Sequence, residues 1–189
     1  NFKKLVLNKN VQREKALINF DLKNVVTAVI VVRLKSKRLP NKALKKINDR
    51  SLIEHLISRL KISKKINKIV LATTKNKEDL KFKKIAKKNK IDFYCGEEKN
   101  VLKRMLNAAK KFKSSMVIRV TGDDILIDPQ YLDRLVEYHL KNNLEYSNNK
   151  KLPGGTEVEI FNFELLSFLQ KVIQNPNDTE YLTFFIDKY

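Results

Sequence analysis

The stretch of sequence that decides the fold is residues 25–42, which read VVTAVIVVRLKSKRLPNK. The first eight of these residues are apolar except for Thr27, and most are β-branched, which is typical of a buried strand. The run is far shorter than the ~20 apolar residues that a membrane-spanning helix needs. The following residues are polar and strongly basic. The stretch therefore predicts a buried strand that ends in a cationic loop.

Strands and helices alternate at short intervals after this loop. The apolar spacing predicts helices at 51–60, 77–89 and 101–109 and one from Pro129, with strands at 68–73, 91–94 and 116–120. Ser51 and Asp128 stand where helix caps are expected. The last third predicts strands at 145–147 and 157–161, joined by a turn at 153–155, and helices at 163–172 and 178–187. This order predicts an α/β fold whose mainly parallel sheet is covered on both faces.

The length of 189 residues suits one α/β domain, which we place at residues 25–189. Residues 1–24 are mixed in character, and we expect either a leader or the tail of a preceding segment. No apolar run approaches 18 residues, and no signal peptide is evident. Cys95 is the single cysteine, so it forms no internal disulfide. These features predict a cytoplasmic protein that does not enter the membrane.

The net charge of +19 is unevenly distributed along the chain. Residues 1–112 carry 32 basic and 9 acidic side chains, whereas residues 113–189 carry 8 basic and 12 acidic ones. In residues 81–90 the apolar positions 82, 85 and 86 fall on one face of a predicted helix, so the lysines lie on its solvent-exposed face. Two interpretations stay open: solvated faces in a lysine-rich protein, or a surface that binds a polyanion such as nucleic acid. Interleaved aromatic residues and known nucleic-acid motifs are absent, so nucleic acid is the weaker of the two.

The loop after the first strand holds five cations in ten positions, at 33, 35, 37, 38 and 42. Arginine side chains form bidentate hydrogen bonds to phosphates, and lysine ammonium groups add positive charge, so both suit a triphosphate. Ligands of open α/β sheets bind beyond the carboxyl ends of the strands, which is where this loop lies. Glycine is missing, which excludes a Walker loop and the dinucleotide fingerprint. The residues alone leave open a phosphate-binding loop or an ordinary basic surface loop.

A second candidate feature is Gly122-Asp123, which follows the strand 116–120 at the same predicted edge. Glycine allows close backbone approach, and Mg²⁺ prefers one or two carboxylates together with phosphates and water. A simple turn is the alternative. Neither His55 nor His139 has the pattern of a nucleophile's partner, so both are interpreted as structural. Cys95 is interpreted as a packing residue.

The pattern Arg33-x-x-Ser36-x-Arg38-Leu39-Pro40-x-Lys42 resembles the signature of sugar cytidylyltransferases, including the CMP-Kdo synthetases and the SpsF-like spore-coat polysaccharide group. The segments 96–104 and 119–129 resemble the SpsF-like group more closely, and the likeness extends over roughly residues 26–187. It implies a Rossmann-like, three-layer nucleotidyltransferase fold with a mainly parallel, mixed sheet. It also implies Mg²⁺-dependent transfer of a cytidylyl group from CTP to a sugar, such as a 2-keto sugar acid, for surface polysaccharide biosynthesis.

The resemblance also assigns residues. It implies that Arg33, Ser36 and Arg38 hold the triphosphate and that Leu34 belongs to the nucleotide site. It also implies that Lys42, the main catalytic residue alongside Arg33 and Arg38, neutralises charge at the α-phosphate. Thr73, Gly96 and Gly122 would surround the nucleotide, and Asp123 would bind Mg²⁺. Glu157 and Glu159 are either part of the sugar site or a solvated strand face. Homodimerisation through residues 145–162 is also expected.

The sequence departs from the family pattern at several positions. Asn100 replaces an Asp, Ile125 a Pro, and Asn41 a Gly. The family also continues to an acidic segment that is thought to supply a second metal carboxylate, whereas this sequence stops at Tyr189. We therefore expect a domain that lacks its C-terminal end. Two other functions stay open: a basic nucleic-acid-binding module, or a non-catalytic relative of the nucleotidyltransferases.

Overall fold

A computed structural model of the chain describes residues 25–35, 39–149, 151–173, 175, 182 and 185–186. The predictions for residues 1–24, for Ser36 and Arg38, and for most of the helix 178–187 lie outside the described residues.

The described residues form a six-stranded mixed sheet in the order β5-β4-β1-β6-β8-β7. The four strands on one side are parallel: β1 (Val26–Val31), β4 (Lys68–Thr74), β5 (Asp92–Gly96) and β6 (Met116–Thr121). The remaining strands, β8 (Glu159–Asn162) and β7 (Tyr146–Asn148), pair in antiparallel fashion. The predicted mainly parallel sheet is therefore confirmed.

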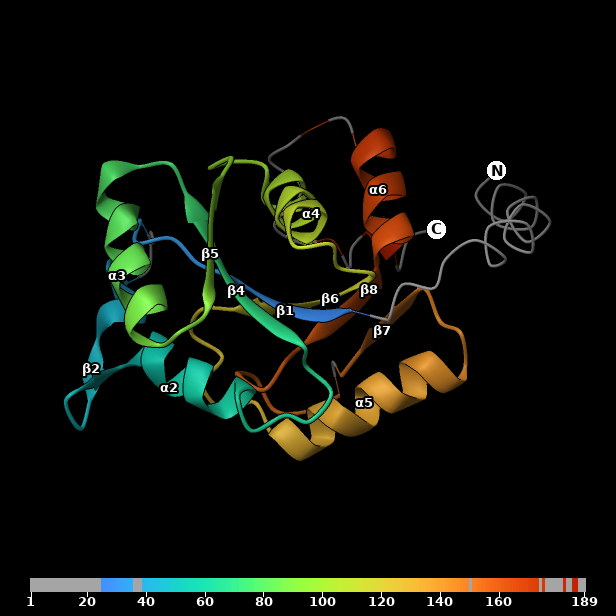
Figure 1. Ribbon diagram of the computed structural model, residues 1–189, viewed down its shortest axis with the longest axis horizontal. Helices are drawn as coiled ribbons and strands as arrows, with labels where there is room; N and C mark the ends of the chain where they lie inside the picture. Colours follow the sequence, from blue (N-terminus) through green and yellow to red (C-terminus); the bar gives the residue numbers. More distant parts are fainter. Residues whose placement is uncertain are drawn as a thin grey trace.

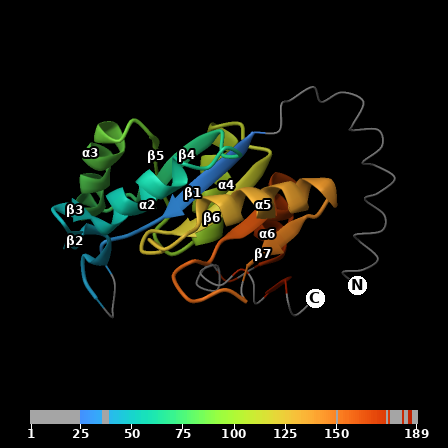
Figure 2. The ribbon, with the colours of Figure 1, turned by 90° about the horizontal axis from the view of Figure 1, so that it is seen from below.

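Helices cover both faces of the sheet (Figure 1). One layer contains α2 (Leu52–Leu60), α3 (Lys81–Lys88) and α5 (Pro129–Lys141), and the other contains α4 (Val101–Lys111) and α6 (Phe163–Val172). Seen from below, α2 and α5 lie across the sheet (Figure 2). Two short 3-10 turns, η1 (Lys42–Leu44) and η2 (Lys77–Leu80), follow β1 and β4. The three-layer architecture agrees with the prediction.

The central strand β1 is buried along its whole length, as the apolar run predicted. Successive side chains of a strand point to opposite faces, so β1 serves both layers. Ala28 and Ile30 join the hydrophobic cluster under α2, α3 and α5, whereas Val29 and Val31 join the cluster under α4 and α6. The strand is thus fixed from both sides, and the loop that follows it starts from a rigid base.

The predicted helix caps are confirmed. Ser51 and Glu54 form a capping box at the start of α2, and Asp128 accepts hydrogen bonds from two backbone N–H groups at the start of α5. Asn100 accepts the backbone N–H of Lys103 at the start of α4, so the family's Asp is replaced without loss of the cap.

Three details differ from the sequence predictions. The predicted helix 77–89 begins as the 3-10 turn η2, and the predicted strand 157–161 begins two residues later, at Glu159. A small hairpin that was not predicted lies between η1 and α2 and consists of β2 (Lys46–Ile47) and β3 (Arg50–Ser51). Its turn residues Asn48 and Asp49 have φ values of 46° and 61°. Asn and Asp tolerate this left-handed conformation, which two-residue hairpin turns require.

Candidate active site

The carboxyl ends of β4, β1 and β6 meet at one edge of the sheet. Val31 lies in register with Ala72 of β4 and Thr121 of β6. Because β8 is antiparallel to β6, its first residue, Glu159, pairs with Arg119 close to the same edge. Ligands of open α/β sheets bind at such an edge. The fold therefore gathers residues from the predicted loop, from Gly122-Asp123 and from the predicted sugar site.

The loop after β1 is closed at its base by Leu34 and Asn41. The Asn41 N–H donates to the Leu34 carbonyl at 3.1 Å, and the Leu34 N–H donates to an oxygen of Asp79 at 2.7 Å. The Leu34 side chain is buried, whereas Arg33 and Lys35 on either side of it are exposed. Asn41 has φ 58° and ψ 22°, in the left-handed region. Asn tolerates that region better than most residues, which explains how it replaces the family's Gly.

Lys42 follows this closure and reaches across to Asp123. The Lys42 ammonium forms an ion pair with an Asp123 carboxylate oxygen. The two side chains are 41% and 27% exposed, so the pair faces solvent at the sheet edge. The structure thus brings together the predicted catalytic lysine and the predicted metal ligand, which are 81 residues apart in the sequence.

Gly122 lies in close contact with the residues at the end of β1. Its backbone N–H donates to the Val31 carbonyl at 3.0 Å. A β-carbon at this position would lie 2.6 Å from Val32 Cγ2 and 2.8 Å from Val32 Cβ, which is inside van der Waals contact. Gly122 therefore allows the residues after β6 to pack closely on those after β1, while its predicted place beside the nucleotide stays a prediction.

The Asp124 side chain turns back toward the end of β6. Its carboxylate accepts the Thr121 N–H at 3.1 Å, and the segment forms a tight turn. Burial, followed by the neighbouring charge of Asp123, raises the pKa of Asp124 to about 6. These two neighbouring carboxylates therefore have different partners: Asp123 pairs with the Lys42 ammonium, and Asp124 accepts a backbone N–H.

Thr73 and Gly96 lie on the predicted nucleotide side of the edge. The Thr73 hydroxyl donates to the Val32 carbonyl at 2.9 Å, so its hydrogen bond is made within the protein. Gly96 packs closely on Arg104 and Tyr94, and an added β-carbon would lie 2.8 Å from an atom of each. Arg104 is buried and donates to the Glu97 carbonyl at 2.6 Å, which fixes the loop after β5.

The two predicted sugar-site glutamates have different surroundings. Glu159 is buried, forms an ion pair with Arg119 and accepts the Tyr146 hydroxyl at 2.9 Å. Glu157 precedes β8 and is exposed. The prediction that both lie on one face of a strand is therefore wrong, because strand pairing with β6 begins only at Glu159. Arg119 and Asp79 are two further polar residues at this edge, and the sequence predicts no role for either.

Both histidines contact structural partners. A ring nitrogen of His55 lies 2.9 Å from the Ile47 carbonyl. His139 is buried between the Ser147 hydroxyl and the Asn162 side chain, and burial lowers its pKa. Burial also raises the pKa of the Cys95 thiol, with a contribution from the charge of Asp79. A thiol with a raised pKa is a poor nucleophile at neutral pH, in agreement with the packing interpretation.

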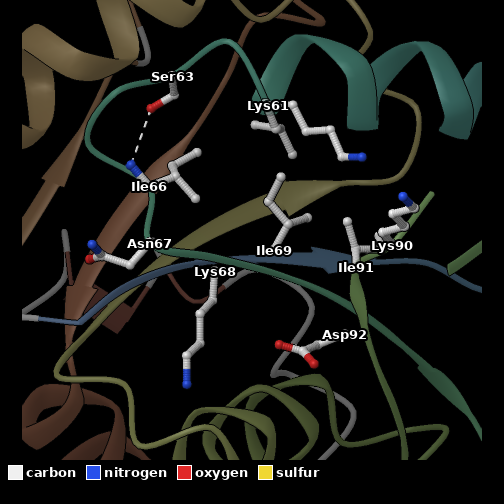
Figure 3. A pocket seen from close by; sticks show the side chains of 10 residues that line it. Lys61, Ser63, Ile66, Asn67, Lys68, Ile69, Lys90, Ile91 and Asp92 are labelled. Atoms are coloured by element: carbon white, nitrogen blue, oxygen red, sulfur yellow. Dashed lines mark hydrogen bonds between the residues drawn. The ribbon is translucent and has the colours of Figure 1, made fainter. Parts of the chain in front are cut away.

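A cavity of about 410 Å³ lies at the opposite, amino-terminal edge of β4 and β5. Lys61, Lys68 and Lys90 line it together with Ser63 and Asp92 (Figure 3). Lys68 and Asp92 project to one side of the sheet, and Lys61 and Lys90 to the other. The Lys68 ammonium donates to the Phe112 carbonyl at 3.0 Å. This cavity is separate from the residues that the sequence singled out.

The sheet, its two helical layers and the residues at its carboxyl edge define an α/β protein of the nucleotidyltransferase fold. Residues 27–182 match the cytidylyltransferase family. Because this match covers most of the sequence, the chain belongs to the cytidylyltransferase family. The predicted family and fold are thereby confirmed.

Individual relatives agree with this assignment. The chain is 37% identical to an uncharacterized protein of Methanocaldococcus jannaschii, over 85% of this chain and 66% of that protein. It is 29% identical to the spore coat polysaccharide biosynthesis protein SpsF of Bacillus subtilis, over 79% and 64%. A solved structure of a cytidylyltransferase from Leptospira borgpetersenii is similar with a TM-score of 0.83 and 31% identity, over 88% and 72%. The chain thus spans slightly less than two thirds of the two curated relatives.

Among the described residues, no helix has both the length and the apolar character needed to cross a membrane.

Proposed function

We propose that this chain binds CTP at the carboxyl edge of the sheet and transfers its cytidylyl group to a sugar, releasing pyrophosphate. The observation that carries the proposal is the contact between Lys42 and Asp123. It lies beside a cationic loop, in a chain that belongs to the cytidylyltransferase family. Such a CTP-dependent reaction fits the cytoplasmic location that the sequence predicts.

In this reaction a sugar hydroxyl oxygen forms a bond to the α-phosphorus of CTP. The bond from that phosphorus to the pyrophosphate oxygen breaks, and the hydroxyl proton is released to solvent. Negative charge grows on the transferring group and on the leaving group. A preorganised cation stabilises such charge where water is partly excluded. We assign this task to Lys42, with Arg33, Ser36 and Arg38 of the loop as triphosphate ligands.

The Asp123 carboxylate is an oxygen ligand of the kind that Mg²⁺ prefers. Within the described residues no three His, Cys, Asp or Glu side chains are grouped as a metal site. Mg²⁺ is nevertheless commonly held by one or two carboxylates together with substrate phosphates and water. Asp123 would hold the ion, which would neutralise charge on the triphosphate. An exposed ion pair contributes only ~0–1 kcal/mol, so the contact with Lys42 is readily exchanged for substrate.

The acceptor would lie at the β6–β8–β7 side of the edge. There Glu159 is held by Arg119 and Tyr146, and Asn148 donates to the Tyr146 hydroxyl at 3.2 Å. These groups offer fixed donors and acceptors for a polyhydroxylated molecule. The motif resemblance to the CMP-Kdo synthetases supports a 2-keto sugar acid, and similarity to SpsF supports a role in surface polysaccharide biosynthesis. Glu157 and homodimerisation through residues 145–162 remain parts of this proposal.

A panel of CTP, UTP, GTP, ATP and dTTP tests the donor. With Mg²⁺, CTP at 100 times its Kd should raise the free energy of unfolding by ~2.7 kcal/mol, and EDTA should reduce the effect. Pyrophosphate release with 2-keto sugar acids then tests the transfer. CTP binding without turnover would indicate a non-catalytic relative. No CTP effect, together with RNA binding that falls steeply with salt, would indicate a nucleic-acid-binding module.

A further inference from the structure

We infer that Asp79 is a positioning residue, which fixes the base of the loop after β1 and thereby the place of Lys42. Its kinetic consequences rest on the proposed function, whereas its structural role does not. Asp79 belongs to η2, between β4 and α3, and is completely buried. One carboxylate oxygen accepts the Leu34 N–H at 2.7 Å, and the other accepts the Thr74 hydroxyl.

These two hydrogen bonds join the ends of neighbouring strands. Thr74 is the last residue of β4, and Leu34 lies three residues after the end of β1. The Thr74 hydroxyl also accepts the Asn76 N–H at 3.1 Å, so the turn that carries Asp79 is tied to the same hydroxyl. Asp79 therefore sets where the backbone leaves β1 relative to β4.

The constraint continues along the loop to the candidate catalytic pair. The Leu34 carbonyl accepts the Asn41 N–H at 3.1 Å, and Lys42 is the next residue after Asn41. Lys42 then contacts Asp123 at the end of β6. A continuous series of contacts thus leads from Asp79 through Leu34 and Asn41 to Lys42.

A carboxylate is specifically suited to this place. Both of its oxygens accept, and the Leu34 N–H and the Thr74 O–H both donate. An Asn side chain would offer one acceptor and direct its amide N–H at Thr74, leaving the hydroxyl proton without its present acceptor. Loss of one acceptor in a buried site is costly because the donor that remains cannot turn to water.

The Asp79 carboxyl group is held by neutral hydrogen-bond donors. Among the described residues no lysine or arginine forms an ion pair with Asp79. Its two oxygens are instead satisfied by the Leu34 N–H and the Thr74 hydroxyl, one donor each. These hydrogen bonds fix the backbone at Leu34, whose carbonyl accepts the Asn41 N–H directly before Lys42.

The test compares Asp79→Ala, Asp79→Asn and Thr74→Val with the matched control Asp133→Asn. Asp133 also accepts a serine hydroxyl and backbone N–H groups of a loop, from Ser63, Lys64 and Lys65, but far from the candidate site. Hydrogen exchange at the Leu34 and Asn41 amides should accelerate at least about tenfold in Asp79→Ala, because local opening becomes easier. The control should leave both amides unchanged.

The kinetic readout is kcat separated from KM for pyrophosphate release. We expect kcat to fall about 10²-fold in Asp79→Ala, as for misplacement of a catalytic group, with smaller losses in Asp79→Asn and Thr74→Val. Unchanged amide exchange, or equal losses in Asp133→Asn, would overturn the inference. If Asp79→Ala does not fold, the two conservative variants decide the matter. If the wild-type chain fails to bind CTP, the proposed function fails, while the exchange comparison still judges Asp79.

Discussion

Replacing Gly122 with alanine should destabilise the fold through steric overlap with one residue, Val32. The new methyl group would lie 2.6 Å and 2.8 Å from two Val32 carbons and 3.4 Å from Ile53 Cδ1. Ordinary contacts between carbons are ~3.5–4.0 Å, so the overlap with Val32 is about 1 Å. Val32 is only 6% exposed and β-branched, so it cannot rotate away freely. Overpacking of this kind costs ~1–3 kcal/mol, and the double overlap points to the upper half of that range.

The assay is thermal and urea unfolding of the wild-type chain and of four variants: Gly122→Ala, Gly154→Ala, Val32→Ala and the double variant Gly122→Ala/Val32→Ala. For a chain of this size, a loss of ~2–3 kcal/mol lowers Tm by about 4–12 °C. Gly154→Ala is the matched control, because a β-carbon there meets nothing within 4 Å and its stability should change by less than ~0.5 kcal/mol. The double variant Gly122→Ala/Val32→Ala should be less destabilised than the sum of its two single changes. A Tm for Gly122→Ala that equals that of Gly154→Ala would refute the reasoning.

Three further predictions concern the candidate site and its surroundings. Lys42→Met and Asp123→Asn should each lower turnover ~10²–10³-fold in a pyrophosphate-release assay, while urea unfolding changes by less than ~1 kcal/mol because the pair is partly exposed. Asn41→Gly should preserve stability, whereas Asn41→Ala should lose ~1 kcal/mol in the same urea assay, since φ is 58°; equal effects would contradict the left-handed conformation. Hydrogen bonds from Lys88 and then Ser51 lower the pKa of Glu54 from 4.5 to about 2. Glu54→Gln should therefore cost ~1 kcal/mol at neutral pH, and the difference should fade as the pH drops from 4.5 toward 2, measured by urea unfolding across that range.

Much of the architecture follows from local patterns. The run before Arg33 has apolar residues on both faces of the predicted strand, which indicates burial from both sides, and β1 is buried in this way. Ser51 and Asp128 were recognisable as caps because their side chains satisfy N–H groups that every helix start leaves open. The closeness of Lys42 and Asp123 also follows from the sequence, because parallel strands bring their carboxyl ends to one edge.

Other features depend on contacts that no local pattern reveals. The role of Asp79 depends on Leu34 and Thr74, which meet it only when β1 and β4 are paired. Glu157 and Glu159 looked equivalent by spacing, but only Glu159 lies within β8, where it meets Arg119 of β6 and is buried. The hairpin at 46–51 was missed because its strands have two residues each, too few to show an alternating pattern.

The reversed direction of β8 has an evolutionary consequence. The parallel strands and their loops, which carry the proposed nucleotide contacts, come from one continuous stretch of chain up to Asp123. The opposite side of the edge comes from a separate stretch, β7 and β8 with the connection between them. Recombination or insertion within residues 146–162 would therefore change the proposed acceptor side while leaving the proposed nucleotide side unchanged. Under the proposed function, we expect chimaeras of relatives joined at these boundaries to inherit their acceptor preference from this segment.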